Sequence, residues 1–299
     1  MQDSPLIITF VLVLMQFLLG ILANSIIVVV NGIGLIKQKK MAPLDLLLSC
    51  LALSRICLQV TILHFCLTVL SLTDLFMLSR NFVTYLFVSE SELWLATWLG
   101  VFYCAKIANV SHPFFFWLKM RITKLVPWLI LGSLLFASAT CVLHSNYVWI
   151  ISQNFSVAFV FKNIVSPVKE KFALQFFLLT VEVSIPLLIF LAAGLLLVFS
   201  LGRHTQQMRN VAAGAGDTPR SASIQAMLSV LSFFILYFSR FTAPALLSLE
   251  NFQFGSLNVL FFALMFGTYP SAHSVILILG NPKLKQNAKK FFLHRKCCQ

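Results

Sequence analysis

The sequence predicts an all-α membrane protein, a bundle of seven transmembrane helices. Only 10% of the 299 residues are charged, whereas 59% are hydrophobic and the mean hydropathy is +0.92. A soluble domain is about 25% charged, so this chain lacks the polar surface to cover a globule of its size. The apolar residues form long runs, and the basic residues cluster between those runs. A soluble enzyme, a disordered chain and a nucleic-acid-binding domain are therefore excluded, although the net charge is +13.

Seven apolar runs are long enough to cross the hydrocarbon core as helices, which takes roughly 20 residues. They lack the alternation of polar and apolar residues that is typical of β-barrel strands. In chain order, we expect spans at Leu6–Val30, Leu44–Leu70, Asn81–Ser111, Val126–Tyr147, Phe172–Leu201, Ile224–Leu249 and Phe254–Leu279. Apart from Asp45 at the start of the second span, the charged residues inside these spans are Arg55 in the second, Glu90, Glu92 and Lys106 in the third, Glu182 in the fifth and Arg240 in the sixth.

The basic residues between spans predict the orientation. Fifteen of the 22 Lys and Arg residues follow the first, third, fifth and seventh spans. By the positive-inside rule, the N-terminus is extracellular and the C-terminus cytoplasmic, as in a multi-pass plasma-membrane protein. The first apolar run is too long for the core of a cleavable signal, so we expect it to act as a signal anchor.

The chain after the seventh span predicts a short amphipathic helix, residues 282–296, on the inner leaflet. Leu284, Ala288, Phe291 and Phe292 share one face of it, opposite several lysines. Acylation of Cys297 and Cys298 would add a second anchor there. On the other side of the membrane, Asn154 begins a glycosylation sequon in the predicted outer loop Val148–Lys171.

Polar residues in the inner half of the predicted bundle form one candidate group. At about 1.5 Å per residue, Asn24 lies about 18 Å and Arg55 about 20 Å from the inner surface. Pairing at this common level would satisfy both side chains. We favour a buried polar clamp; the alternative is a switch that rearranges on activation. The other members of the group are Tyr103, Lys106, Pro270, His273 and Ser274.

Ionisable residues in the outer half form a second candidate group. Three carboxylates, Glu90, Glu92 and Glu182, accompany one basic residue, Arg240. One interpretation is a set of internal ion pairs, such as Glu182 with Arg240; the other is a ligand-binding site. Glu90 and Glu92 lie about 200° apart around a helix, so they point in different directions. We favour a ligand-binding role for Glu90, because aromatic and polar residues neighbour it.

No catalytic, nucleotide-binding or metal-binding motif is present in the sequence, so we expect neither an enzyme nor a cofactor nor a metal site. Seven spans, an outside N-terminus and an inner-leaflet helix together favour a G-protein-coupled receptor. A small-solute transporter or channel is the alternative, although we find no internal repeat. The usual motifs of rhodopsin-like receptors are missing from the third, sixth and seventh spans.

Four segments stand in place of those motifs. They are LDLLLSCLALSRI at Leu44–Ile56, LWLATWLGVFYCAKIANVSHP at Leu93–Pro113, LGRHTQQM at Leu201–Met208 and HSVILILGNPKLKQ at His273–Gln286. These segments resemble the second, third, fifth and seventh spans of the bitter (type 2) taste receptors, and the resemblance extends over the whole chain.

The resemblance implies a receptor that binds small bitter agonists and activates a heterotrimeric G protein of the gustducin/inhibitory type. The positions that match the agonist pocket of this family are Tyr85, Ser89, Glu90 and Ala263. Those that match its inner polar network are Asn24, Arg55, Tyr103, Lys106, His273 and Ser274. Asn154 falls in the second outer loop, where the family is usually glycosylated.

Overall fold

The computed structural model of the chain describes residues 3–70, 75–108, 112–160, 166–211 and 256–294. These residues form seven helices and no strand: α1 (Asp3–Gln38), α2 (Pro43–Leu70), α3 (Leu75–Ile107), α4 (Pro113–Val160), α5 (Ser166–Val211), α7 (Ser256–Gly280) and α8 (Pro282–His294). The predicted sixth span, Ile224–Leu249, lies outside the described residues.

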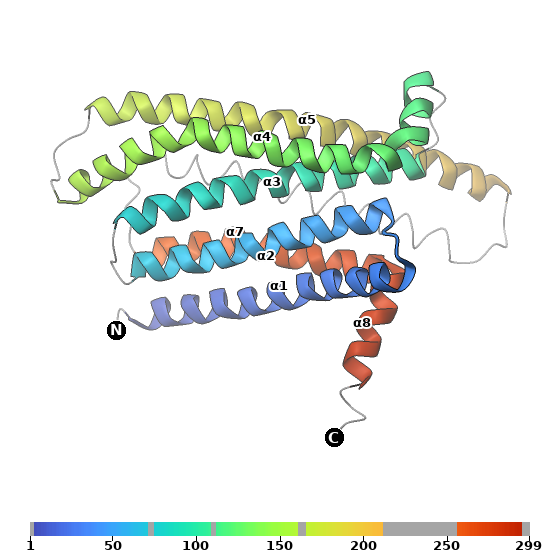
Figure 1. Cartoon of the computed structure of the whole chain (residues 1–299), viewed down its shortest axis with the longest axis horizontal. Coiled ribbons are helices and arrows are strands. Elements are labelled where there is room, and N and C mark those ends of the chain that lie inside the picture. The colour runs from blue at the N-terminus through green and yellow to red at the C-terminus, as the bar shows by residue number, and fades with distance from the viewer. Residues whose placement is uncertain (1–2, 71–74, 109–111, 161–165, 212–255, 295–299) are drawn as a thin grey trace.

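The long helices run side by side and form a bundle (Figure 1). α1 lies at one edge, α4 and α5 lie at the opposite edge, and α2, α7 and α3 lie between them. α3 contacts α2, α4 and α5, and α7 contacts α1 and α2. The chain begins at one end of the bundle, and α8 turns away from the axis at the other end.

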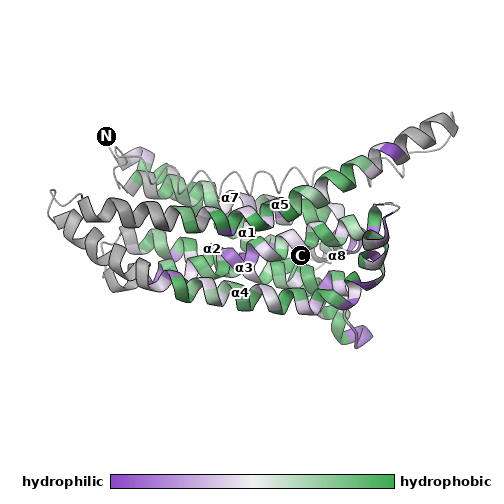
Figure 2. Cartoon of the chain, turned by 90° about the horizontal axis from the view of Figure 1, so that it is seen from above, coloured by the Kyte–Doolittle hydropathy of each residue, from purple (hydrophilic) through white to green (hydrophobic). Residues whose placement is uncertain are grey.

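The surface of the bundle is suited to lipid. Five of the helices are long and apolar enough to cross a membrane, judged by length and composition alone. α3 is not among these five, and it carries Glu90 and Glu92 in its middle. Large apolar side chains point outward, among them Leu18, Trp128 and Phe199, each more than half exposed. Figure 2 shows that hydrophobic residues cover most of the long helices. The all-helical membrane fold is therefore confirmed.

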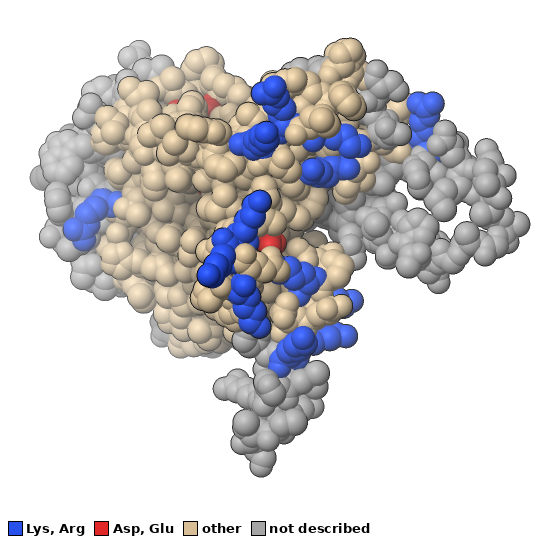
Figure 3. All heavy atoms as spheres, turned by 45° about the vertical axis from the view of Figure 1, so that its right-hand side comes forward, with Lys and Arg blue, Asp and Glu red and all other residues tan. Residues whose placement is uncertain are grey.

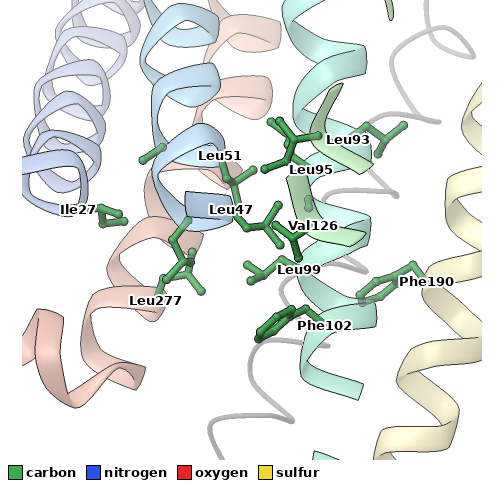
Figure 4. Close-up of a cluster of buried hydrophobic side chains, with 14 of the residues drawn as sticks. Ile27, Leu47, Leu51, Leu93, Leu95, Leu99, Phe102, Val126, Phe190 and Leu277 are labelled. Carbon is green, nitrogen blue, oxygen red and sulfur yellow. The ribbon is translucent and has the colours of Figure 1, made fainter. Parts of the chain in front are cut away.

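Buried aliphatic and aromatic side chains from all seven described helices hold the bundle together. Figure 4 shows those of α3 meeting side chains from the helices on both sides of it. Those labelled are Ile27, Leu47, Leu51, Leu93, Leu95, Leu99, Phe102, Val126, Phe190 and Leu277. Because α3 has neighbours on several sides, it is apolar around much of its circumference.

Local sequence signals fix the start of α8. Asn281 precedes the helix, and its side-chain oxygen accepts hydrogen bonds from the backbone N–H groups of Lys283 at 3.0 Å and Leu284 at 3.4 Å. This is an N-cap, and Pro282 follows at the first helical position, where its missing N–H has no effect on the helix. The side chain of Lys283 forms an ion pair with Asp45 at the start of α2. Leu284 is 0% exposed and packs into the main core, so α8 is joined to the bundle.

Basic side chains gather over the end of the bundle from which α8 leaves (Figure 3). They come from the last turn of α1, the α1–α2 connection, the first turns of α4, and α8. We call this surface the basic face; its residues are Lys37, Lys39, Lys40, Lys119, Arg121, Lys124, Lys285, Lys289 and Lys290.

Two predicted boundaries differ from the helices observed. The predicted outer loop Val148–Lys171 is mostly helical, because α4 continues to Val160 and α5 begins at Ser166. No Pro or Gly occurs between Gly132 and Pro167 to end α4 earlier. α3 begins at Leu75 and ends at Ile107, whereas the span was predicted at Asn81–Ser111.

The contact between α3 and α5 gives a first testable prediction. A Cβ at Gly100 would lie 2.8 Å from two ring carbons of Phe190, which is 1% exposed and cannot swing aside. We expect Gly100→Ala to lower the free energy of unfolding by about 1–3 kcal/mol, as overpacking does, although alanine favours helix. Thermal unfolding of the purified protein measures the change.

Gly132 of α4 is the matched control, because nothing lies within 4 Å of the corresponding Cβ position. Gly132→Ala should leave stability unchanged or raise it by up to about 1 kcal/mol through helix propensity. If both substitutions changed stability equally, the result would contradict the close contact between the Phe190 ring and Gly100 of α3.

Candidate functional site

Arg55 of α2 lies at the centre of a buried polar cluster. The side chain is 0% exposed, and its Nε atom lies 3.0 Å from Oε1 of Glu92 on α3. Nη1 donates to the hydroxyl of Ser274 at 3.2 Å, and Nη2 donates to the hydroxyl of Tyr269 at 3.3 Å. Nη2 also donates to Nδ1 of His273. One guanidinium therefore binds one group on α3 and three on α7.

Asn24 of α1 joins this cluster through α7. The Ser274 hydroxyl lies 2.7 Å from Oδ1 of Asn24 and 2.7 Å from the carbonyl of Pro270. Ser274 thus lies between Asn24 and Arg55, which the sequence had placed at the same depth. We call the following residues the Arg55 cluster: Asn24, Arg55, Glu92, Tyr269, His273 and Ser274.

Two rings of α7 form one wall of the Arg55 cluster. Tyr269 and His273 are one helical turn apart and stack with their centroids 5.5 Å apart. The guanidinium carbon of Arg55 lies 5.6 Å from the centroid of the Tyr269 ring, within the range of a cation–π contact. Because Nδ1 of His273 accepts a hydrogen bond from Arg55, the neutral imidazole carries its proton on Nε2. Tyr269 was not predicted from the sequence, although its position one turn before His273 was a usable signal.

The Arg55 cluster is stable only as a unit. Arg55 and Glu92 are almost completely buried, so both lose the hydration that would stabilise their charges. Their mutual attraction and the hydrogen bonds from α7 offset that loss. Breaking such a pair by removing one partner typically costs about 3–5 kcal/mol. The cluster therefore fixes α1, α2, α3 and α7 relative to one another.

The position of Glu92 differs from the sequence-based expectation. That expectation grouped Glu92 with outer residues near a ligand, whereas the structure pairs it with Arg55. The third span was predicted to end at Ser111, but α3 ends at Ile107. Counted from Ile107, Glu92 is fifteen residues, or about 22 Å, along the helix. That matches the depth of about 20 Å for Arg55.

Glu182 of α5 has a partner that the sequence did not suggest. Its Oε1 atom lies 2.9 Å from Nε2 of His144 on α4. His144 is 3% exposed. The sequence left open whether Glu182 pairs with Arg240 or binds a ligand, and Arg240 lies outside the described residues. His144 was overlooked because the fourth span was read as uncharged, although a histidine at membrane depth is itself a signal.

Residues from α3 and α7 form an aromatic cluster nearer the N-terminal end of the bundle. Tyr85 of α3 meets Phe266 of α7 edge to face, with centroids 6.2 Å apart. Ala263 of α7 is buried in the same cluster. Ser89, one turn along α3 from Tyr85, is 2% exposed. The structure thus brings the predicted residues Tyr85 and Ala263 together.

Glu90 lies on another side of α3. It is five residues from Tyr85, or about 140° around the helix. Glu90 is 5% exposed, and its Oε1 atom accepts a hydrogen bond from Nε1 of Trp94 at 3.0 Å. Trp94 stacks on Trp98 and meets Phe136 of α4 edge to face. Glu90 and Glu92 therefore engage different neighbours, in agreement with their predicted separation around the helix.

Comparisons with known proteins agree with these observations. The family model of the taste receptor proteins (TAS2R) matches residues 1–296. The chain is 58% identical over 299 residues to taste receptor type 2 member 1 of Pan paniscus, with 100% of both chains covered. It is 47% identical over 298 residues to taste receptor type 2 member 119 of Rattus norvegicus, covering 100% of this chain and 88% of the relative.

The chain belongs to the taste receptor type 2 family. It is therefore a multi-pass membrane protein. The members of this bitter taste receptor family are G-protein-coupled receptors that bind ligands. This family membership was predicted from the four sequence segments around the second, third, fifth and seventh spans.

Two residues that the taste receptor resemblance assigned to the inner network lie apart from the Arg55 cluster. Tyr103 is half-buried and packs against the main hydrophobic core. Lys106 is exposed near the end of α3, with its ammonium 6.0 Å from the centroid of the Phe102 ring. Pro270 lies inside α7, where its carbonyl accepts from Ser274.

Several predictions concern parts of the taste receptor that the structure does not describe. Arg240, Cys297 and Cys298 lie outside the described residues, as does the side chain of Asn154, whose backbone belongs to α4. Glycosylation and acylation remain predictions. Among the residues that are described, no three His, Cys, Asp or Glu side chains lie close enough together to hold a metal ion.

Proposed function

We propose that this receptor binds small bitter-tasting molecules in the half of the bundle nearer the N-terminus, and activates a heterotrimeric G protein of the gustducin/inhibitory type. The observation that carries the proposal is the separation of chemistries along the bundle. A buried carboxylate and an aromatic cluster lie towards one end, the basic face covers the other end, and the Arg55 cluster lies between them.

The proposed agonist pocket includes Tyr85, Ser89, Glu90, Glu182 and Ala263. Aromatic and small apolar side chains provide contact area for an organic ligand, and a few polar groups orient it. Glu90 would attract a cationic or hydrogen-bond-donating group of the agonist, because hydrogen bonds to a carboxylate from a charged donor are among the strongest in proteins. Glu92 is left out of the pocket because Arg55 binds it.

The proposed mechanism is a population shift. Agonist binds more tightly to a conformation in which the basic-face ends of α5 and the predicted sixth span move apart, and this opens a cleft for the G protein. The Arg55 cluster joins four of the helices below the pocket, so rearranging its hydrogen bonds is one way to link the two ends.

The basic face is proposed to be cytoplasmic, with the N-terminus extracellular and the receptor in the plasma membrane. Positive charge on short loops favours the cytoplasmic side during insertion. Arg203 near the end of α5 is exposed, and with Arg209 and Arg220 it would meet the G protein and the anionic inner leaflet.

Agonist-dependent nucleotide exchange on a purified G protein tests the function. The receptor in lipid nanodiscs, mixed with a gustducin or inhibitory heterotrimer, should accelerate GTP binding when a bitter agonist is added. The control is the same mixture with a stimulatory-class heterotrimer. If proteoliposomes instead showed solute flux and no exchange occurred with any heterotrimer, the protein would be a transporter or channel.

A further inference from the structure

A small cavity of about 10 Å³ lies between α1, α2 and α7, one helical turn from the Arg55 cluster on the side of the N-terminus. Gln16 of α1, Gln59 of α2 and Gly267 of α7 line it, together with apolar side chains that include Phe17 and Ala263. Two polar side chains thus face a space that is otherwise apolar.

Each glutamine presents an unsatisfied oxygen at this position. Gln59 is 3% exposed, and its Nε2 atom donates to the hydroxyl of Ser271 at 2.6 Å. The Oε1 atoms of Gln16 and Gln59 are both inaccessible to solvent, and neither receives a hydrogen bond from any residue that the structure describes. A buried amide oxygen without a donor is unfavourable, so these two acceptors need a partner.

Glycines at the helix contacts hold both amides in place. A Cβ at Gly20 of α1 would lie 1.8 Å from Nε2 of Gln59, and a Cβ at Gly267 would lie 1.8 Å from Nε2 of Gln16. Each amide therefore occupies the space that any larger residue on the facing helix would fill. Only glycine at both positions lets the two glutamines reach the same cavity.

The size and chemistry of the cavity select its occupant. A volume of about 10 Å³ is at the lower limit for one water molecule and far too small for an organic agonist. No carboxylate lines the cavity, whereas a bare cation is usually bound by several oxygens that include carboxylates. Water supplies two donors, and the two glutamines that line the cavity carry two acceptors without a donor.

We propose that this cavity is a hydration site, in which one water molecule donates to Oε1 of Gln16 and to Oε1 of Gln59. The water completes a second polar layer parallel to the Arg55 cluster. In the first layer, Ser274 of α7 links Asn24 and Arg55. In the second layer, Ser271 of α7 is bound to Gln59, and the water links Gln59 to Gln16. Both layers join α1, α2 and α7 close to Pro270, where α7 lacks one backbone donor.

A double-mutant cycle on the purified receptor tests this bridge. If one water joins the two amides, Gln16→Leu and Gln59→Leu should each lower the unfolding midpoint by several degrees. Each substitution removes one acceptor of the water and so weakens its hydrogen bond to Oε1 of the remaining glutamine. The double variant should lose clearly less than the sum of the two shifts. Gln286→Leu on the exposed face of α8 is the control and should leave the midpoint unchanged. Strictly additive shifts, or single variants that are both stabilised, would mean that no shared water is present.

Radiolytic labelling tests for the water directly. Hydroxyl radicals formed from bound water label adjacent side chains, so Phe17 should be labelled in the parent and at least fivefold less in the double variant. Equal labelling in both proteins would overturn the proposal. Exchanging sodium chloride for choline chloride separates water from a cation. The midpoint should not change, and a midpoint that rises only with sodium would assign the site to the cation instead.

Discussion

Replacing Arg55 with alanine is expected to destabilise the receptor by about 3–5 kcal/mol, which is more than most single substitutions cost. The substitution leaves the carboxylate of Glu92 buried without its cation. It also removes the guanidinium that donates hydrogen bonds to Ser274, Tyr269 and His273. The expected readouts are a lower unfolding midpoint in detergent and less receptor at the cell surface. For the Arg55→Ala receptors that do reach the cell surface, the order of agonist potencies should be the same as in the parent.

Two further variants separate charge from geometry at this position. Arg55→Lys keeps the charge but cannot reach α3 and α7 with one planar group, so its stability should lie between those of the parent and Arg55→Ala. Arg55→Met combined with Glu92→Leu removes both buried charges and should be milder than Arg55→Ala alone. A normal midpoint together with a changed agonist order in Arg55→Ala would move Arg55 from the helix contacts to the agonist site.

The second large effect is expected at Glu90. Glu90→Gln should weaken cationic agonists about 10- to 100-fold in half-maximal concentration, because a hydrogen bond to a charged group contributes about 1.5–3 kcal/mol. Glutamine has the same shape and retains an oxygen that can accept from Trp94, so the fold should be preserved. Calcium responses of cells expressing equal amounts of surface receptor measure the shift.

Neutral agonists are the internal control for Glu90, and their potency should change by less than threefold. Trp94→Phe is the matched variant. It keeps an aromatic side chain beside Trp98 and Phe136 and leaves the Glu90 carboxyl group in place, but it removes the Nε1–H donor of the indole. Cationic agonists should remain active on it. Equal losses for cationic and neutral agonists in Glu90→Gln would remove Glu90 from the proposed pocket.

Which polar residues lie inside the bundle could be predicted from the sequence alone. Asn24, Arg55, His273 and Ser274 are uncommon within apolar runs, and the structure places all four at 0% exposure in one cluster. Asn24 and Arg55 lie at a common level, as predicted, because both residue counts began near the true ends of α1 and α2.

Partners were much harder to predict than burial. The predicted third span ended at Ser111, beyond the end of α3, and Glu92 was grouped with the outer residues. His144 was not considered as a partner for Glu182, because histidine was counted as neutral. The glutamines at the cavity, Gln16 and Gln59, gave no signal in the sequence, since their importance depends on glycines of facing helices.

The sequence by itself determined the membrane class, the helical fold, the family and part of the set of polar residues that cannot face lipid. These follow from composition and from spacing along the chain, because the hydrocarbon core penalises every unpaired polar group in the same way. The tertiary structure alone decided which of those groups meet. Helical periodicity fixes the direction in which a side chain points around the axis of its helix. Which neighbouring helix that side chain then faces depends on how all the helices pack. Arg55 therefore binds Glu92 and α7, Glu182 binds His144, and Glu90 lies beside Trp94.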